Sequence, residues 1–221
     1  MPGLADFDPR YFVAIIVTFV IAITVHEFMH AWTAWMLGDD TARMLGRVSL
    51  NPVVHFDPVG ALLFFLIALG FPGIAWGKPV PVNDFRLRPV GRFGRQGSMA
   101  LVSFAGPLSN VVLGAIAAGI LRFSGAAGID LRGADQFLWI FMSVNFLLAA
   151  FNLVPLPPLD GSRILIALLP PFWRPVLAPL ERYGVPILIL LLIFGRGIGS
   201  SIIGGITEPV RELLLKIFAG Q

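Results

Sequence analysis

The fold of this chain is decided by the stretch VTFVIAITVHEFMHAWTAW at residues 17–35, which lies inside a longer apolar run at about residues 11–37. A run of this length exceeds the roughly 18 apolar residues that mark a helix able to cross a bilayer. Its interior nevertheless carries His26, Glu27 and His30, three ionisable side chains that are costly in lipid. That cost indicates a functional site in a membrane helix.

The spacing of these three residues is typical of a metal site. His26 and His30 are four residues apart, so both lie on the same face of a helix, one turn above the other. This spacing suits two ligands of a tetrahedral Zn²⁺, and Glu27 between them can serve as the general base of a hydrolysis. The motif therefore predicts metal-assisted hydrolysis within the membrane; the alternative is a buried polar cluster that only helps helices to pack.

Composition extends the membrane assignment to the rest of the chain. Hydrophobic residues make up 57% of the 221 residues and charged residues 13%, with a mean hydropathy of +0.84. Soluble domains carry about 25% charged residues. The sequence has no cysteine, so only His, Asp or Glu can hold a metal. The net charge of +3 does not indicate nucleic acid binding, because the arginines flank apolar runs, where they act as topology signals.

The remaining apolar runs predict an all-α polytopic membrane protein with about 5–6 membrane helices. These runs lie at about residues 59–76, 97–121, 136–152 and 184–206, and a short helix is expected at 162–169. We expect loops at residues 122–135 and extended structure at 41–57 and in the proline-rich stretch 77–96. A single integral membrane domain would cover residues 1–221, with a core at about 11–169 and a C-terminal membrane helix and amphipathic tail at about 184–218.

The run at 59–76 decides the topology, because Gly70, Pro72 and Gly73 interrupt it. If this run re-enters the side from which it came, more of the Lys and Arg residues collect on one side than if it spans the bilayer. The positive-inside rule therefore favours a re-entrant segment, with the basic loops in the cytoplasm and the N-terminus outside. This arrangement also makes the first and fourth runs parallel.

The two histidines leave a catalytic zinc one protein ligand short, since such sites usually have three. Asp160 is the best candidate, because a carboxylate in the proline-rich break after the fourth run would be costly without a cation. His55 is the competitor, as a site-lining residue or a loop histidine at the membrane surface, and Asp57 is conceivable. Asn152 is either a helix C-terminal residue or a hydrogen-bonding partner for the backbone of a substrate.

Three motifs in this order resemble the site-2 protease family of intramembrane zinc metalloproteases. They are HEFMH, FAGPLSN at residues 104–110 and NLVPLPPLDG at residues 152–161. The stretches LNPVVHFDPVG and WGKPVPVN are similar to its compact prokaryotic branch, and we see no inserted PDZ domain and no C-terminal nucleotide-sensing domain. Taken alone, the pair Gly106-Pro107 is interpreted as a kink and packing point, not as a catalytic element.

The resemblance implies that His26, His30 and Asp160 bind Zn²⁺, that Glu27 is the base and that Asn152 helps to hold the substrate. It also implies a site toward the cytoplasmic side of a bacterial or archaeal cell membrane. The segment KPVPVN would receive the substrate as an added strand. The expected function is a zinc-dependent endopeptidase that cuts within or near the transmembrane segments of single-pass membrane proteins.

Two other classes of protein are compatible with histidines and an aspartate in membrane helices. A metal transporter would place its ligands along a path, often duplicated between two halves of the chain. Here a single compact set of ligands contains a glutamate placed as a base, which favours the enzyme. A metal-binding membrane protein without protease activity belongs with the transporter. A catalytically silent scaffold or chaperone is the third class, and the complete His, Glu and Asp set argues against it.

Overall fold

The computed structural model describes residues 8–69, 76–173 and 199–220, together with residues 175, 177, 179, 183, 184 and 186–188. Over these residues the chain is all-α, as predicted, and the one pairing of extended backbone is an isolated bridge between Phe56 and Gly77. The helices are α1 (Pro9–Met36), α2 (Thr41–Met44), α3 (Pro58–Ala68), α4 (Gly94–Ala127), α5 (Ala134–Asn152), α6 (Asp160–Leu168) and α8 (Gly199–Leu214). Short helical turns lie at Pro52–Val54, Gly91–Phe93, Pro171–Trp173 and Leu215–Ala219.

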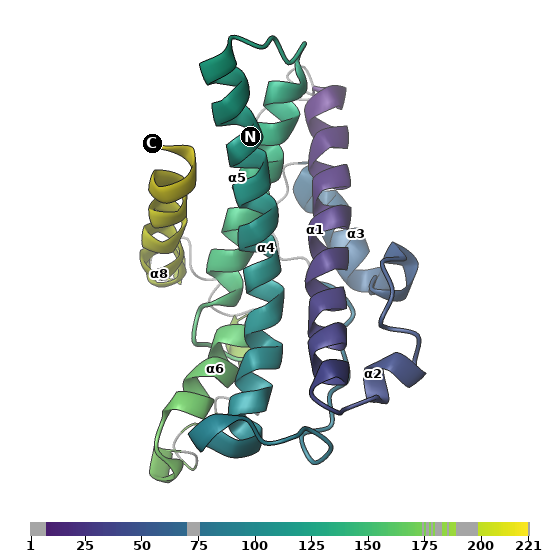
Figure 1. Ribbon diagram of the computed structural model, residues 1–221, viewed down its shortest axis with the longest axis vertical. Helices are drawn as coiled ribbons and strands as arrows, with labels where there is room; N and C mark the ends of the chain where they lie inside the picture. The colour runs from purple at the N-terminus through teal and green to yellow at the C-terminus, as the bar shows by residue number, and fades with distance from the viewer. Residues whose placement is uncertain are drawn as a thin grey trace.

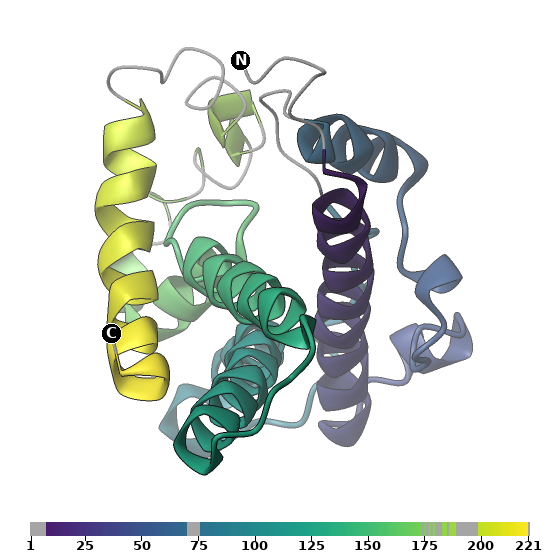
Figure 2. The ribbon, with the colours of Figure 1, turned by 90° about the horizontal axis from the view of Figure 1, so that it is seen from above.

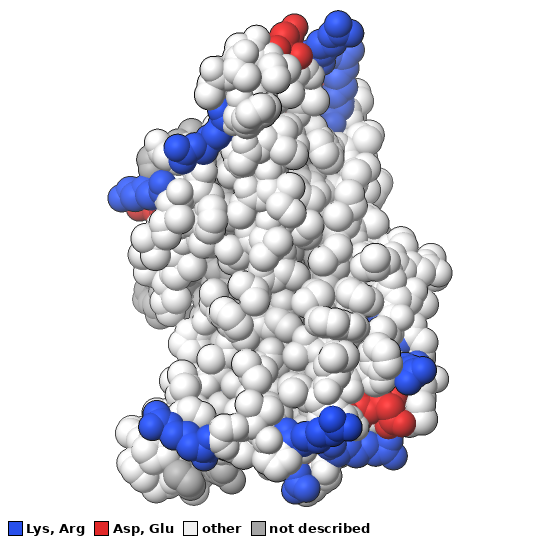
Figure 3. Space-filling view, in the orientation of Figure 1, with Lys and Arg blue, Asp and Glu red and all other residues white. Residues whose placement is uncertain are grey.

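Three helical segments are long and apolar enough to cross a membrane: α1, α4 with the turn before it, and α5. They form the centre of the molecule, and α4 runs antiparallel to α1 and α5 (Figure 1). The α3 helix lies beside α1, and α8 lies on the opposite side of the bundle (Figure 2). Charged side chains gather at the two ends of the visible face, with an apolar belt between them (Figure 3). This distribution is that of a protein embedded in a bilayer.

Small side chains let the three central helices approach closely. Ala22, Ala31 and Ala34 of α1 are fully buried. On α4, a Cβ added at Gly114 would overlap the ring of Phe146 of α5. Close approach of this kind is typical of helix packing in lipid, where attraction comes from van der Waals contact.

The loops differ from the sequence expectation in two places. Residues 122–135 were expected to form a loop, but α4 continues to Ala127, because nothing breaks the helix before Gly128, which ends it with a φ of 65°. Residues 41–57 were expected to be extended, but they contain α2 and the turn Pro52–Val54. The side chain of Asn51 caps this turn by accepting a hydrogen bond from the N–H of Val53 at 3.1 Å.

The segment between α1 and α4 begins and ends at the same end of the bundle. Directly after α1, the carbonyl of Leu37 accepts a hydrogen bond from the N–H of Arg88 at 2.8 Å, and the carboxylate of Asp39 accepts one from the N–H of Asn83 at 2.6 Å. Within this segment α3 has 11 residues, which span about 16 Å, roughly half of the hydrocarbon core. Gly70, Pro72 and Gly73 lie outside the described residues, as do residues 185 and 189–198 of the run at 184–206.

Candidate metal centre

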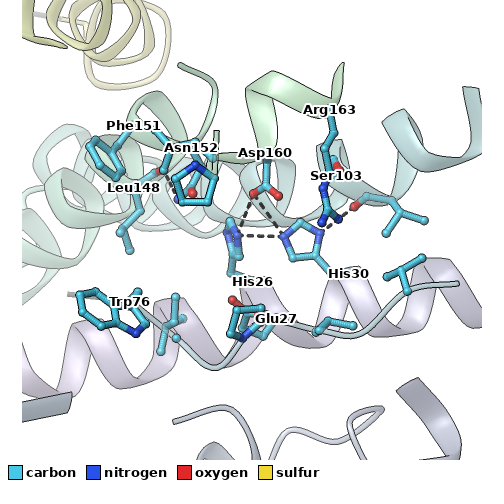
Figure 4. A pocket seen from close by; sticks show the side chains of 18 of the residues that line it. His26, Glu27, His30, Trp76, Ser103, Leu148, Phe151, Asn152, Asp160 and Arg163 are labelled. Carbon is cyan, nitrogen blue, oxygen red and sulfur yellow. Dashed lines mark hydrogen bonds and ion pairs between the residues drawn. The ribbon is translucent and has the colours of Figure 1, made fainter. Parts of the chain in front are cut away.

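Three side chains from two distant parts of the chain converge on one point inside the bundle (Figure 4). The Nε2 atoms of His26 and His30, both on α1, are 3.0 Å apart. The Oδ2 atom of Asp160, the first residue of α6, lies 3.2 Å from the first of them and 3.3 Å from the second. Three ligands of a tetrahedral zinc at 2.0–2.1 Å would be about 3.3 Å apart. The cluster therefore fits one zinc ion.

The other nitrogen of each imidazole holds the ring in the state that a metal needs. The Nδ1–H of His26 donates to the side-chain oxygen of Asn110 at 2.6 Å. The Nδ1–H of His30 donates to the carbonyl of Val102 at 2.7 Å. Because both acceptors are oxygens that carry no proton, both Nδ1 atoms must be the donors. Both Nε2 atoms then keep a free lone pair for the metal.

Asn110 belongs to a buried polar chain that joins α1, α4 and α5. Its amide nitrogen donates to the side-chain oxygen of Asn145 at 2.9 Å, and Asn145 in turn donates to the carbonyl of Phe141 at 2.8 Å. Both asparagines are fully buried. Asn110 is the last residue of the FAGPLSN motif, whereas Asn145 belongs to none of the motifs predicted from the sequence. The signal that was available is the cost of an asparagine in an apolar membrane helix.

Removal of the Asn110 acceptor is expected to weaken zinc binding. Asn110→Ala leaves the Nδ1–H of His26 unpaired in a buried site and frees the ring to turn, so the affinity for zinc should fall by about 10- to 100-fold. Asn110→Asp keeps an acceptor oxygen and should bind more tightly than the alanine variant. Competition with a chromophoric chelator measures both. An affinity of Asn110→Ala equal to that of the wild type would show that the chain of asparagines does not support the site.

Gly106 forms the wall of α4 against the ligand atoms. A Cβ at this position would lie 2.7 Å from Nε2 of His26 and closer still to Nε2 of His30. The lack of a side chain at Gly106 thus leaves room for the two imidazoles. This role is more specific than the kink and packing point expected from the sequence. The helix continues through the adjacent Pro107, which is buried.

The open side of the cluster faces a cavity of about 440 Å³. Glu27 lines this cavity beside the ligands, and it is only 8% exposed. The non-helical segment after α3 passes close to it, since a Cβ added at Gly77 would lie 3.2 Å from Oε1 of Glu27. Asn152, at the end of α5, also lines the cavity, and its amide nitrogen donates to the carbonyl of Leu148 at 2.9 Å. The arrangement places a carboxylate next to a metal position at the edge of a cavity large enough for a peptide segment.

The two competitors for the third ligand position have other partners. His55 is fully buried in the loop before α3, where burial lowers its pKa, and its Nε2 lies 2.6 Å from the carbonyl oxygen of Ser49. It is not among the residues that line the cavity. The carboxylate of Asp57 caps α3 by accepting hydrogen bonds from the N–H groups of Val59 and Gly60. Asp160 is the candidate that the fold brings to the histidines.

A two-histidine, one-aspartate cluster with a neighbouring glutamate, held among apolar spanning helices, defines a membrane zinc metallopeptidase. Comparisons agree with this class. Residues 127–195 match the family model described as Peptidase family M50. The chain is 37% identical to YwhC of Bacillus subtilis (strain 168) over 93% of its own length and 90% of the relative.

Two further relatives extend the comparison. The chain is 34% identical to Rip2 of Mycolicibacterium smegmatis over 82% of its own length and 67% of the relative. It is 27% identical to MJ0392 of Methanocaldococcus jannaschii over 57% and 38%, respectively. Each relative is classed as a zinc metalloprotease in its name. No solved structure matches the chain.

The chain therefore belongs to peptidase family M50, the site-2 protease family, and is a zinc metalloprotease with several membrane helices. The family that the sequence motifs predicted is confirmed.

Proposed function

We propose that this protein is a zinc-dependent intramembrane endopeptidase that hydrolyses peptide bonds within or near the transmembrane segments of membrane proteins. The observation that carries the proposal is the position of the ligand cluster within a membrane helix. His30 precedes the end of α1 at Met36 by six residues, or about 9 Å along the helix axis. A peptide bond in the adjacent cavity would lie below the membrane surface.

We assign each of these residues of the cavity a separate role in the hydrolysis. His26, His30 and Asp160 would hold the zinc ion, which supplies a Lewis acid that polarises the scissile carbonyl and acidifies water. Glu27 takes a proton from the attacking water and passes it to the nitrogen of the leaving amine. The side chain of Asn152 forms a hydrogen bond with the main chain of the substrate. The substrate helix must unwind locally, because the carbonyls of an intact helix are already hydrogen-bonded.

The segment KPVPVN provides an edge for this unwound chain. Gly77, Pro79, Val80 and Val82 all line the cavity. In extended backbone, alternate residues direct their N–H groups to opposite edges. The prolines at 79 and 81 have no N–H, so the edge that carries Val80 and Val82 is the one that can donate to an added strand. We infer that the substrate pairs with this edge, as peptides do in strand addition.

A substitution that removes one donor of this edge tests the pairing. Val80→Pro deletes the N–H of residue 80 within an already proline-rich segment, whereas Val80→Ala shortens the side chain and keeps the N–H. We expect the proline variant to bind substrate about tenfold more weakly than the alanine variant, with equal zinc content. Binding of a fluorescent transmembrane peptide to each variant in detergent measures the difference. Equal affinities would exclude main-chain pairing through Val80.

The position of the site along the bundle supports an active site on the cytoplasmic side. The segment between α1 and α4 returns to the end from which it came, as shown by the hydrogen bond between Arg88 and Leu37. We infer that α3 belongs to a re-entrant segment, in a single domain with about 5–6 membrane helices. Three arginines lie at this end: Arg43 on α2 directly after α1, Arg86, which pairs with Asp40, and Arg88, which bonds to Leu37. The positive-inside rule assigns this end to the cytoplasm of a bacterial or archaeal cell.

Reconstitution of the purified protein with transmembrane peptides tests the proposed function. The zinc-loaded protein in lipid vesicles is incubated with single-pass peptides that carry Gly, Pro or Asn near one end of the apolar segment, and the products are identified by mass spectrometry. We expect a cut within or next to the apolar segment, lost on chelation and restored by zinc. Zinc uptake into the vesicles without peptide cleavage would instead indicate a transporter.

A further inference from the structure

One end of the cavity carries two polar side chains that the proposed hydrolysis does not use. Ser103 of α4 lines the cavity and is 1% exposed, and its hydroxyl has no hydrogen-bond partner among the described residues. Buried hydroxyls are normally hydrogen-bonded, because an unmet polar group costs free energy. A hydroxyl that borders a substrate cavity and lacks a partner points to a group supplied by the ligand.

Arg163 borders the same end of the cavity. It lies one turn after Asp160 on α6, and no carboxylate of the described residues pairs with it. Its guanidinium approaches the sulfur of Met99 at 4.0 Å. Met99 precedes Ser103 by one helical turn, so the arginine lies against the same stretch of α4. The nearby Asp160 does not neutralise it, because its Oδ2 is directed to both imidazoles.

The cavity therefore has a polar end and an apolar end. Figure 4 shows Ser103 and Arg163 on the His30 side of the ligand cluster, whereas Trp76 and Phe151 lie on the His26 side. His30 is nearer than His26 to the end of α1 at Met36, and Arg43 of α2 follows directly after that end. A substrate lying across the ligands would place its apolar segment at the Trp76 end and its polar flank at the Arg163 end.

We propose that Arg163 and Ser103 form a substrate subsite for a carboxylate on the polar flank of the scissile bond. This inference rests on the proposed protease function and adds a preference that the family assignment does not contain. The planar guanidinium matches the two oxygens of a carboxylate, and the hydroxyl of Ser103 can donate a further hydrogen bond. The carboxylate can come from an Asp or Glu side chain or from a chain that ends at this point.

A peptide panel tests the subsite with the full-length, zinc-loaded protein. Transmembrane peptides carry Glu, Gln or Lys at each successive position of the polar flank, and a second set ends at these positions with a free carboxylate or an amide. At one position we expect kcat/KM for Glu to exceed that for Gln by about tenfold. The second set shows whether a terminal carboxylate serves as well as a side chain.

Charge reversal supplies the decisive comparison. Arg163→Glu should invert the preference, so that Lys peptides are cleaved better than Glu peptides. Arg95→Glu makes the same charge change on an exposed residue at the same end of the bundle but outside the cavity, and it should keep the preference of the wild type. Ser103→Ala should reduce the preference for Glu without inverting it, and Ser103→Thr should retain it.

The outcomes separate the subsite from the protease itself. Cleavage of Glu, Gln and Lys peptides with equal kcat/KM, or an unchanged preference in Arg163→Glu, overturns the subsite and leaves the protease intact. If the wild type cleaves no peptide, the protease proposal fails. Affinities of the same peptides for the Glu27→Gln variant then decide the subsite alone: tighter binding of Glu than Gln peptides supports it, and equal binding overturns it.

Discussion

Glu27→Gln is expected to retain one zinc ion per protein and to lose about 10²- to 10⁴-fold in the rate of peptide hydrolysis. The amide matches the carboxylate in size, so the packing beside Gly77 is kept. None of the three atoms that would hold the metal belongs to residue 27. An amide cannot accept a proton from water near neutral pH, so the attacking water stays un-ionised and the leaving amine receives no proton.

Two measurements on the same preparation make this prediction sharp. In Glu27→Gln, zinc content by elemental analysis should be retained while turnover of a transmembrane peptide is lost. In Asp160→Ala, which removes a ligand, both should be lost. Glu208→Gln provides a matched control, because this exposed glutamate lies on α8, where it pairs with Arg211. Turnover of Glu27→Gln within a few fold of the wild type would remove Glu27 from the chemistry.

Gly106→Ala is expected to abolish zinc binding while α4 stays helical. The new methyl group would have to occupy the space of both Nε2 atoms, at 2.7 Å from that of His26 and nearer to that of His30. Real Cβ atoms do not approach so closely, so either the imidazoles rotate away or α1 and α4 separate. In both cases the three ligand atoms no longer converge. Alanine is a better helix former than glycine, so the helix itself gains stability.

The matched control lies on the same helix. A Cβ at Gly119 would meet nothing within 4 Å, so Gly119→Ala should keep full zinc content and activity. Gly114→Ala provides a third case, because its methyl group would strike the ring of Phe146, away from the ligands. That variant should lose thermal stability more than zinc affinity. If Gly106→Ala bound zinc with the affinity of the wild type, α4 would have to leave room for a methyl group beside the two imidazoles, and the predicted overlap would be wrong.

The membrane helices were largely predictable, because apolar length is a local property. The first run was expected at about residues 11–37, and α1 covers Pro9–Met36; the fourth was expected at 136–152, and α5 covers Ala134–Asn152. The end of α4 was placed too early, since the polar residues after 121 were interpreted as a loop. The polar residues after 121 are compatible with a helix, so they do not end it. The helix ends where Gly128 takes up a left-handed backbone conformation.

Only the part of the candidate site that lies on a single helix was predictable from the sequence. Two histidines on one helix face follow from a spacing of four residues, whatever the rest of the chain does. The third ligand could be chosen over His55 and Asp57 only as a preference. Asn145 escaped notice because its partner is 35 residues away in the sequence. Contacts of this kind depend on which faces of α1, α4 and α5 pack together.

The amino-acid sequence by itself determined the class of the protein, the two imidazoles and the glutamate, because helical periodicity and the cost of charge in lipid act within one segment. Only the tertiary structure decided that Asp160 completes the cluster, that Gly106 leaves room for it and that Arg163 borders the same cavity. These three residues reach the site through the packing of α4 against α1 and of α6 against α4. Such packing depends on side-chain shape across helices, which no single stretch of sequence contains.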